Sequence, residues 1–270
     1  MKYFITYGDK NYEKSKKRIG TEAEATGFFD RVITYGKEDL SDDILNVDLM
    51  RYKRGGGYFV WKPFVVEKTL LSMNDGDILV YADSGCSVFK NDKWERYFHI
   101  LNKYDALMFM LPLTCEAYTR KNIIEHFSAI GKNWKNRYQI ATTFFLLKKN
   151  EHTIQFVQEW KQTMLQHPEF VVDVAKENLQ EESFRFIENR HDQSIFCALA
   201  YKYAKPFNFK IQFHHFEGLD RFRKQAIVAT RISDSGVRGG NKRRFIKNIL
   251  YYVLALPYRH LYQKFWVLMK

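Results

Sequence analysis

The sequence predicts an α/β fold in which a mixed, mostly parallel sheet is flanked by helices and followed by a basic amphipathic helical C-terminal tail. Short runs rich in β-branched and aromatic residues alternate with longer helical segments along most of the chain, a pattern typical of βαβ units. Hydrophobic residues make up 46% of the 270 positions and aromatic residues 17%. The chain can therefore bury a sizeable core, and intrinsic disorder is excluded.

Each expected element has a local signal. The strands at 2–7 and 31–35 both end in Ile-Thr-Tyr-Gly, repeated at about the spacing of one βαβ unit. A helix at 63–73 begins with Pro63, whose missing N–H has no partner in a first turn. Turn-forming residues then precede an uncharged run at 78–81, which predicts a buried strand. Further strands are expected at 106–113, 138–147 and 211–216, and further helices at 12–29, 91–103, 119–127, 151–165 and 191–203.

The positive charge is concentrated at the C-terminal end. Residues 221–270 contain 12 Lys and Arg against one acid, so they carry +11 of the net charge of +12. We therefore expect a domain at 1–220 and a basic tail at 221–270. Its uncharged run at 248–258 is shorter than the 18 or more residues that span a bilayer. The basic and apolar faces of 243–270 instead predict a helix lying on an anionic membrane surface, the alternative being helices that pack on the domain.

Cysteine use and the N-terminus indicate a cytoplasmic protein. Cys86, Cys115 and Cys197 lie far apart with no C-x-x-C pair, which indicates a reducing compartment and no structural zinc. The N-terminus turns polar after a few residues and is too short for a signal peptide. With the basic tail, this predicts a location on the inner face of the cell membrane.

One carboxylate, Asp83, follows the predicted strand at 78–81, and Ser84 and Gly85 come next. Open α/β sheets bind ligands at the carboxyl ends of their strands, and small residues leave room for a bulky ligand. A divalent cation bound to a diphosphate fits this pattern; the alternative is an aspartate that only forms a turn. Upstream, the segment Arg54-Gly-Gly-Gly-Tyr58 forms a flexible turn or contacts a ligand. Lys62 either binds an anion at a helix N-terminus or is solvated.

Three further groups are candidates for chemistry. Asp192, in the first turn of a predicted helix, either caps amides or acts as a general base for an acceptor hydroxyl, beside Gln193 as a sugar ligand. Of the adjacent His214 and His215, only one can face a site, and imidazole suits Mn²⁺. Arg231 and Arg238 are candidates to close over a diphosphate, or ordinary surface arginines.

Together these segments resemble bacterial glycosyltransferases of capsular and lipopolysaccharide gene clusters, of the GT-A fold class. The resemblance rests on GYFVWKP at 57–63, GDILVYADSGC at 76–86 and HDQS at 191–194, and covers about residues 1–220. It implies a nucleotide-binding sheet and transfer of a sugar, with a hexose such as galactose on UDP as the expected donor. The acceptor would be a saccharide or a lipid-linked saccharide.

The resemblance also implies roles for single residues. Donor binding falls to Thr6, Tyr7, Lys62, Asp83, Ser84, Gly85, Arg231 and Arg238, and acceptor binding to His191 and Gln193. Asp83 and His215 would hold Mn²⁺ or Mg²⁺, and Asp192 would be catalytic. Many GT-A enzymes carry Asp-x-Asp, but Gly85 stands at the second acid position, which puts the metal requirement in doubt. We favour inversion at the anomeric carbon; if the enzyme retains, Asp192 only orients the sugar.

Two other functions stay open. The first is a non-catalytic protein that binds a sugar nucleotide. The second is a nucleic-acid-binding protein that uses the basic tail. The sequence disfavours the second, because the basic groups of the tail alternate with a long apolar face.

Overall fold

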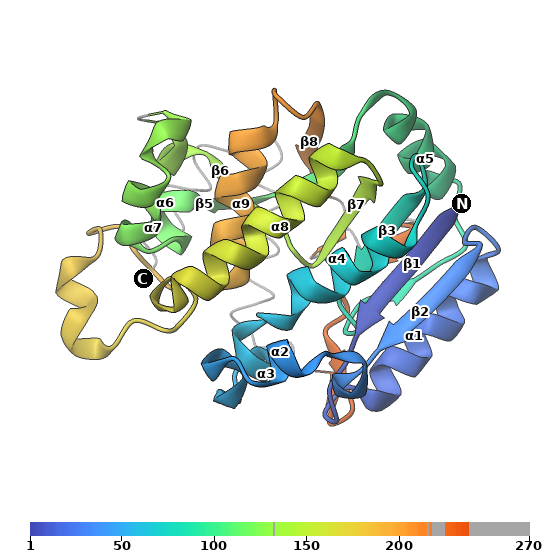
Figure 1. Cartoon of the computed structure of the whole chain (residues 1–270), viewed down its shortest axis with the longest axis horizontal. Helices are drawn as coiled ribbons and strands as arrows, with labels where there is room; N and C mark the ends of the chain where they lie inside the picture. The colour runs from blue at the N-terminus through green and yellow to red at the C-terminus, as the bar shows by residue number, and fades with distance from the viewer. Residues whose placement is uncertain (132, 215, 218–224, 238–270) are drawn as a thin grey trace.

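A seven-stranded sheet forms the centre of the molecule, in a computed structural model that describes all residues except 132, 215, 218–224 and 238–270 (Figure 1). The strand order is β2-β1-β3-β7-β5-β6, and β8 pairs with β5. The strands are β1 (Lys2–Tyr7), β2 (Arg31–Tyr35), β3 (Ile78–Ala82), β5 (Ala106–Thr114), β6 (Tyr138–Ile140), β7 (Phe144–Lys148) and β8 (Phe209–Phe213). Only β6 and β7 run against the other five strands of this sheet. The predicted mixed, mostly parallel sheet is confirmed.

Helices cover both faces of this sheet (Figure 1). The longer ones are α1 (Glu13–Thr26), α4 (Trp61–Ser72), α5 (Lys93–Lys103), α8 (Glu151–Gln166) and α9 (Asp192–Tyr203). Single-turn and short helices are α2 (Asp42–Leu45), α3 (Gly55–Tyr58), α6 (Cys115–Tyr118) and α7 (Lys121–His126). Two small antiparallel pairs complete the described part: β4 (Ser87–Val88) with β9 (Ile227–Val228), and β10 (Ile232–Ser233) with β11 (Gly236–Val237).

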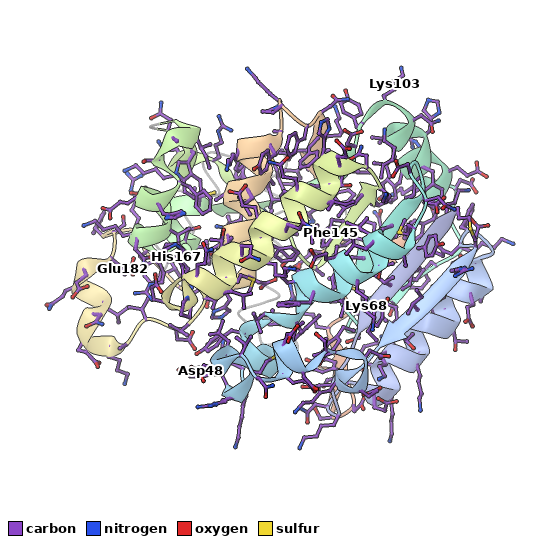
Figure 2. All side chains as sticks on the ribbon, in the orientation of Figure 1. Asp48, Lys68, Lys103, Phe145, His167 and Glu182 are labelled. Atoms are coloured by element: carbon purple, nitrogen blue, oxygen red, sulfur yellow. The ribbon has the colours of Figure 1, made fainter. Side chains whose placement is uncertain are left out.

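Alternate residues of each strand enter two separate hydrophobic clusters. Leu79 and Tyr81 of β3 pack with α4, α8 and α9, whereas Val80 and Ala82 pack on the opposite face with α1 and α5. Phe145, labelled in Figure 2, lies in the interior and is fully buried. Successive side chains point to opposite faces and both faces are covered, which explains why β3 (Ile78–Ala82) is an uninterrupted apolar run.

The strand expected at 138–147 is two strands instead of one. β6 pairs with β5, through Met110 and Ile140 for example, whereas β7 pairs mainly with β3. The chain changes neighbour at 141–143, and these residues are not in a strand. The carbonyl of Thr143 accepts a hydrogen bond of 2.9 Å from the backbone N–H of Asp83. The break therefore places two threonines at the carboxyl end of β3.

The glycine triplet forms a left-handed helical turn. Five consecutive residues, from Gly55 to Phe59, have positive φ between 52° and 100°. The N–H of Tyr58 donates to the carbonyl of Arg54 at 2.7 Å, and that of Phe59 to Gly55 at 3.2 Å. This conformation costs roughly 1–2 kcal/mol for each non-glycine residue, and such strain collects at functional sites. One of the two alternatives for segment 54–58 was a flexible turn; the structure shows a turn that is closed by backbone hydrogen bonds.

Gly57→Ala is expected to destabilise the protein by several kcal/mol, because it combines backbone strain with steric overlap. The φ of Gly57 is 100°, and an added Cβ would lie 2.8 Å from Met50 Sδ and 3.0 Å from the Leu49 carbonyl oxygen. Gly27→Ala is the matched control: its φ is 71°, but nothing lies within 4 Å, so it should cost only about 1 kcal/mol. Urea unfolding measures both variants, and equal losses would contradict the steric account.

The predicted tail is described only at its start. Residues 225–237 pack on the 1–220 domain: β9 pairs with β4, and Asp234 accepts hydrogen bonds from the N–H groups of Lys14 and Ser15 at 3.0 and 2.9 Å. The amphipathic segment 243–270 and Arg238 lie outside the described residues. Within the described part, no helix is long and apolar enough to cross a membrane.

Candidate active site

A cavity of about 620 Å³ opens at the carboxyl ends of β1 and β3, within the usual range of small-molecule sites. One group of lining residues, here called the strand-end side, lies where these strands end. Tyr7, Gly8 and Asp9 come from the end of β1, Ser84 and Gly85 follow β3, and Arg231 belongs to the segment that packs against Gly85. A second group of lining residues, here called the arginine side, comprises Lys53, Arg54, Glu188, Asn189, Arg190 and His191. Lys62, Asp83 and Asp192 also line the cavity and are joined by ion pairs.

A buried ammonium group links two carboxylates in this cavity. Lys62 Nζ lies 3.1 Å from Asp83 Oδ1 and 3.3 Å from Asp192 Oδ2. The Lys62 side chain is 2% exposed and that of Asp192 4%, whereas that of Asp83 is 34% exposed. Rings of Phe59, Trp61 and Tyr81 lie 5.1–5.7 Å from the same nitrogen. The alternative of a solvated Lys62 is therefore wrong.

The three charges determine each other's protonation. Burial alone would lower the pKa of Lys62, but Asp192 and Asp83 together raise it above its usual value, so Lys62 stays a cation. Burial raises the pKa of Asp192 to about 6, against the lowering effect of Lys62. Asp192 is thus mostly ionised at neutral pH and can accept a proton there.

Asp192 does not serve as a helix cap. The residue before it, His191, occupies the N-cap position with φ 55° and ψ −123°, and makes no side-chain cap hydrogen bond. The carboxylate of Asp192 is instead directed to Lys62, 130 positions earlier in the chain. This favours the interpretation of Asp192 as a functional carboxylate over the capping alternative.

Position 85 leaves little room for a side chain, because another segment of backbone packs against it. A Cβ at this position would lie 3.2 Å from the carbonyl oxygen of Ile232 and 3.4 Å from Arg231 Cα. The N–H of Ile232 and the hydroxyl of Thr230 both donate to the carbonyl of Gly85, at 3.1 and 2.8 Å. Part of the room that we expected for a ligand after Ser84 is therefore filled by residues 230–232. The same contacts hold Arg231 at the cavity, where it pairs with Glu217 at 2.6 Å.

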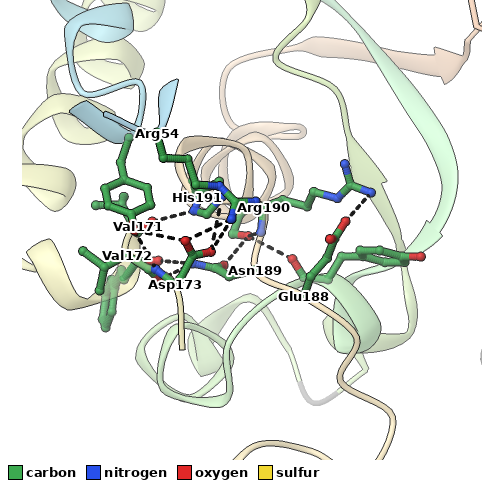
Figure 3. Close-up of polar contacts among 12 residues, drawn as sticks. Arg54, Val171, Val172, Asp173, Glu188, Asn189, Arg190 and His191 are labelled. Atoms are coloured by element: carbon green, nitrogen blue, oxygen red, sulfur yellow. Dashed lines mark hydrogen bonds and ion pairs between the residues drawn. The ribbon is translucent and has the colours of Figure 1, made fainter. Parts of the chain in front are cut away.

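Two aromatic rings and two polar groups complete the lining. Tyr7 stacks on Trp61 with ring centroids 3.8 Å apart. Gln193 donates a side-chain hydrogen bond of 3.1 Å to Gln139. The Nδ1 of His191 lies 2.6 Å from the carbonyl oxygen of Val171 (Figure 3). Because a carbonyl can only accept, Nδ1 is the donor, and burial lowers the pKa of His191, so the ring is neutral near pH 7.

The described residues do not form a divalent-cation site on their own. No group of three or more His, Cys, Asp and Glu side chains among them is placed to hold a metal. Oδ1 of Asp83 already contacts Lys62 and accepts a hydrogen bond from Tyr81 at 2.8 Å. The second expected ligand, His215, lies outside the described residues. The metal requirement stays a prediction, and we derive no catalytic step from it.

The cavity brings together most of the site residues expected from the sequence: Tyr7, Lys62, Asp83, Ser84, Gly85, His191, Asp192, Gln193 and Arg231. Thr6 is fully buried, and its hydroxyl has no hydrogen-bond partner among the described residues; it is not among the lining residues. The sequence analysis included Arg54 as part of the segment 54–58, but it did not single out Arg190, Thr142 or Thr143 as cavity residues. Arg190 stands beside the HDQS segment, and this adjacency was the available signal.

Comparisons with known proteins give distant structural neighbours. No protein-family model and no curated protein sequence matches the chain. Mouse xyloside xylosyltransferase 1 is 12% identical with a TM-score of 0.44, covering 80% of this chain and 87% of its own. A glycosyltransferase for the major capsid protein of PBCV-1 is 10% identical at TM-score 0.44, covering 92% and 98%. The galactosyltransferase LgtC is 13% identical at TM-score 0.39, covering 80% and 75%.

Proposed function

We propose that this chain is a glycosyltransferase that moves a hexose, such as galactose, from a UDP-sugar to a saccharide or lipid-linked acceptor. The pathway would be synthesis of a bacterial surface polysaccharide. One observation carries the proposal: a buried lysine joins Asp83 and Asp192 in a cavity at the carboxyl ends of β1 and β3. Ligands bind at this edge of open α/β sheets, and general acid–base groups are often buried carboxylates with a raised pKa.

In the proposed reaction, the donor occupies the strand-end side. An acceptor oxygen attacks the anomeric carbon, the bond from this carbon to the diphosphate oxygen breaks, and UDP leaves with the bonding electron pair. Asp192 accepts the proton of the attacking hydroxyl, as an inverting displacement requires. Lys62 and Arg231 provide fixed positive charge near the leaving group, and such preorganised electrostatics are often the largest catalytic contribution.

The rate of sugar transfer is expected to fall as pH is lowered through about 6, the raised pKa of Asp192. Below this pH the carboxyl group holds its own proton and cannot accept one from the acceptor hydroxyl. A rate profile at saturating donor measures this effect, with UDP affinity measured at each pH as the control. A rate that stays constant down to about pH 5 would assign the base to another group.

Release of UDP from a UDP-hexose in the presence of a glycoside panel tests the proposed activity. We expect acceptor-dependent release by the wild-type chain and little by Asp83→Asn. Binding of UDP-sugars without release under any condition would favour the alternative of a non-catalytic sugar-nucleotide-binding protein. Absence of binding by any nucleotide sugar would contradict the proposal as a whole.

We also propose, from the sequence alone, that the segment 243–270 holds the enzyme on the cytoplasmic face of the membrane. The supporting observation is the net charge of +11 that residues 221–270 carry. Flotation with anionic liposomes should carry the full-length chain and not a chain ending at residue 242. Equal flotation of both chains would contradict this part of the proposal.

A further inference from the structure

Among the described residues, the arginine side of the cavity has more positive than negative charge. It contains three described cations, Lys53, Arg54 and Arg190, and one described lining acid, Glu188. A second acid, Asp173, reaches Arg54 from outside the lining at 2.9 Å. With two acids for three cations, the arginine side favours an anionic ligand group.

The acids that pair with the two arginines are easily exchanged. Arg190 contacts Glu188 at 2.8 Å, and Figure 3 shows Arg54 and Arg190 each reaching a separate carboxylate. The side chains of Asp173 and Glu188 are 47% and 48% exposed. Exposed ion pairs contribute only about 0–1 kcal/mol. An anionic ligand group can therefore replace or join Glu188, or join Asp173, at little cost.

Two buried nitrogens on this side have no hydrogen-bond partner among the described residues: Arg190 Nε and His191 Nε2. Buried polar atoms are normally satisfied, so such exceptions indicate an incomplete site. Nδ1 of His191 donates to Val171, which leaves a lone pair on Nε2 to accept a hydrogen bond. The nearest carboxylate oxygen, on Asp173, is 3.9 Å away, too far for a hydrogen bond. A ligand hydroxyl is the complementary group.

The backbone holds these groups in place. Arg54 precedes the left-handed turn, and Tyr58 in that turn donates from its hydroxyl to Asp173 at 3.0 Å. His191 has a positive φ of 55°, and the carbonyl of Val171 orients its ring. The backbone at Arg54 and His191 is therefore already ordered in the protein without ligand. Binding then costs less conformational entropy, which favours affinity.

From this arrangement we infer that the acceptor is an acidic saccharide. Its anionic group, a carboxylate or a phosphate, binds at Arg54 or Arg190, and a hydroxyl donates to His191. This inference rests on the proposed glycosyl transfer and adds the chemical class of the acceptor. The anionic group selects the acceptor and takes no part in bond breaking.

Calorimetric titration of the full-length chain saturated with UDP tests the inference with matched sugars. Methyl β-glucuronide and methyl β-glucoside differ only at C6, which carries a carboxylate in the first and a hydroxymethyl group in the second. Glucose 6-phosphate distinguishes a phosphate from a carboxylate preference. We expect at least one of the acidic sugars to bind about tenfold or more tightly than the neutral glycoside, as charged hydrogen bonds allow. Arg54→Gln or Arg190→Gln should remove most of this difference.

Arg51→Gln is the matched control, because Arg51 pairs with Asp48 at 3.3 Å but does not line the cavity. It should leave the preference for acidic sugars unchanged. Arg190 also stacks on Tyr118, so Arg190→Lys, which keeps the charge, separates loss of charge from loss of packing. Equal binding of acidic and neutral sugars, or an unchanged preference in both glutamine variants, would overturn the inference. UDP binding would still stand in that case, whereas failure of UDP to bind would count against the proposed function itself.

Discussion

Asp192→Asn is expected to slow sugar transfer by about 10²–10⁴-fold, the usual contribution of a general base. Asparagine keeps the shape of the side chain but cannot accept the proton of an acceptor hydroxyl. The affinity for UDP should change little, because in the proposed reaction Asp192 acts on the acceptor. Steady-state rates and UDP calorimetry measure the two effects separately.

Asp48→Asn is the control for this variant, since Asp48 is an exposed carboxylate that does not line the cavity. Its rate should equal that of the wild type. A decrease of less than about tenfold in Asp192→Asn would show that Asp192 only orients the sugar. That result would favour retention of anomeric configuration over inversion.

Lys62→Met is expected to lower the free energy of unfolding by about 3–5 kcal/mol, the usual cost of removing one partner of a buried ion pair. Methionine has a similar length but leaves the buried Asp192 carboxylate without its cation. Without Lys62 the pKa of Asp192 rises further, so the loss should become smaller as pH falls towards the wild-type pKa of Asp192, about 6, and stay constant below it, because the protonated carboxyl group is cheaper to bury. Urea unfolding at several pH values measures the effect.

Two further variants isolate the charge effect. Adding Asp192→Asn to Lys62→Met removes the uncompensated charge and should restore part of the lost stability. Lys121→Met removes an exposed lysine that lies 3.8 Å from Glu125, and it should cost less than about 1 kcal/mol. Equal free energies of unfolding for the Lys62→Met and Lys121→Met variants would contradict the assignment of Lys62 as the cation that stabilises the buried Asp192 carboxylate.

Local sequence patterns predicted β1, β2, β3 and β5 and the position of Asp83; the strand expected at 211–216 lies at 209–213 instead. β1 and β2 have the predicted bounds, because apolar runs ending at glycine are read from neighbouring residues alone. Asp83 follows β3 as expected for the same reason. The division of 138–147 between β6 and β7 was missed, since it depends on which strand each residue pairs with, and an apolar run carries no such information.

The chemistry of the site depended on contacts between distant positions. Lys62 was expected to bind an anionic ligand, but it pairs with Asp83 and with Asp192, which is 130 positions away. The positive φ of three glycines is compatible with their type, whereas that of Tyr58 and Phe59 is imposed by tertiary contacts such as the hydrogen bond to Asp173. The residue types therefore indicated which side chains belong to the candidate site, whereas the fold determined which of them form ion pairs and hydrogen bonds with one another.

Hydrogen–deuterium exchange of the full-length chain with and without UDP and Mn²⁺ tests most directly whether the cavity is a donor site. We expect UDP to protect backbone amides at 7–9, 83–86 and 229–233, the segments that meet on the strand-end side. The exposed helix α7 serves as an internal reference and should be unchanged. Protection elsewhere, with none in these three segments, would contradict the assignment of this cavity to a sugar nucleotide.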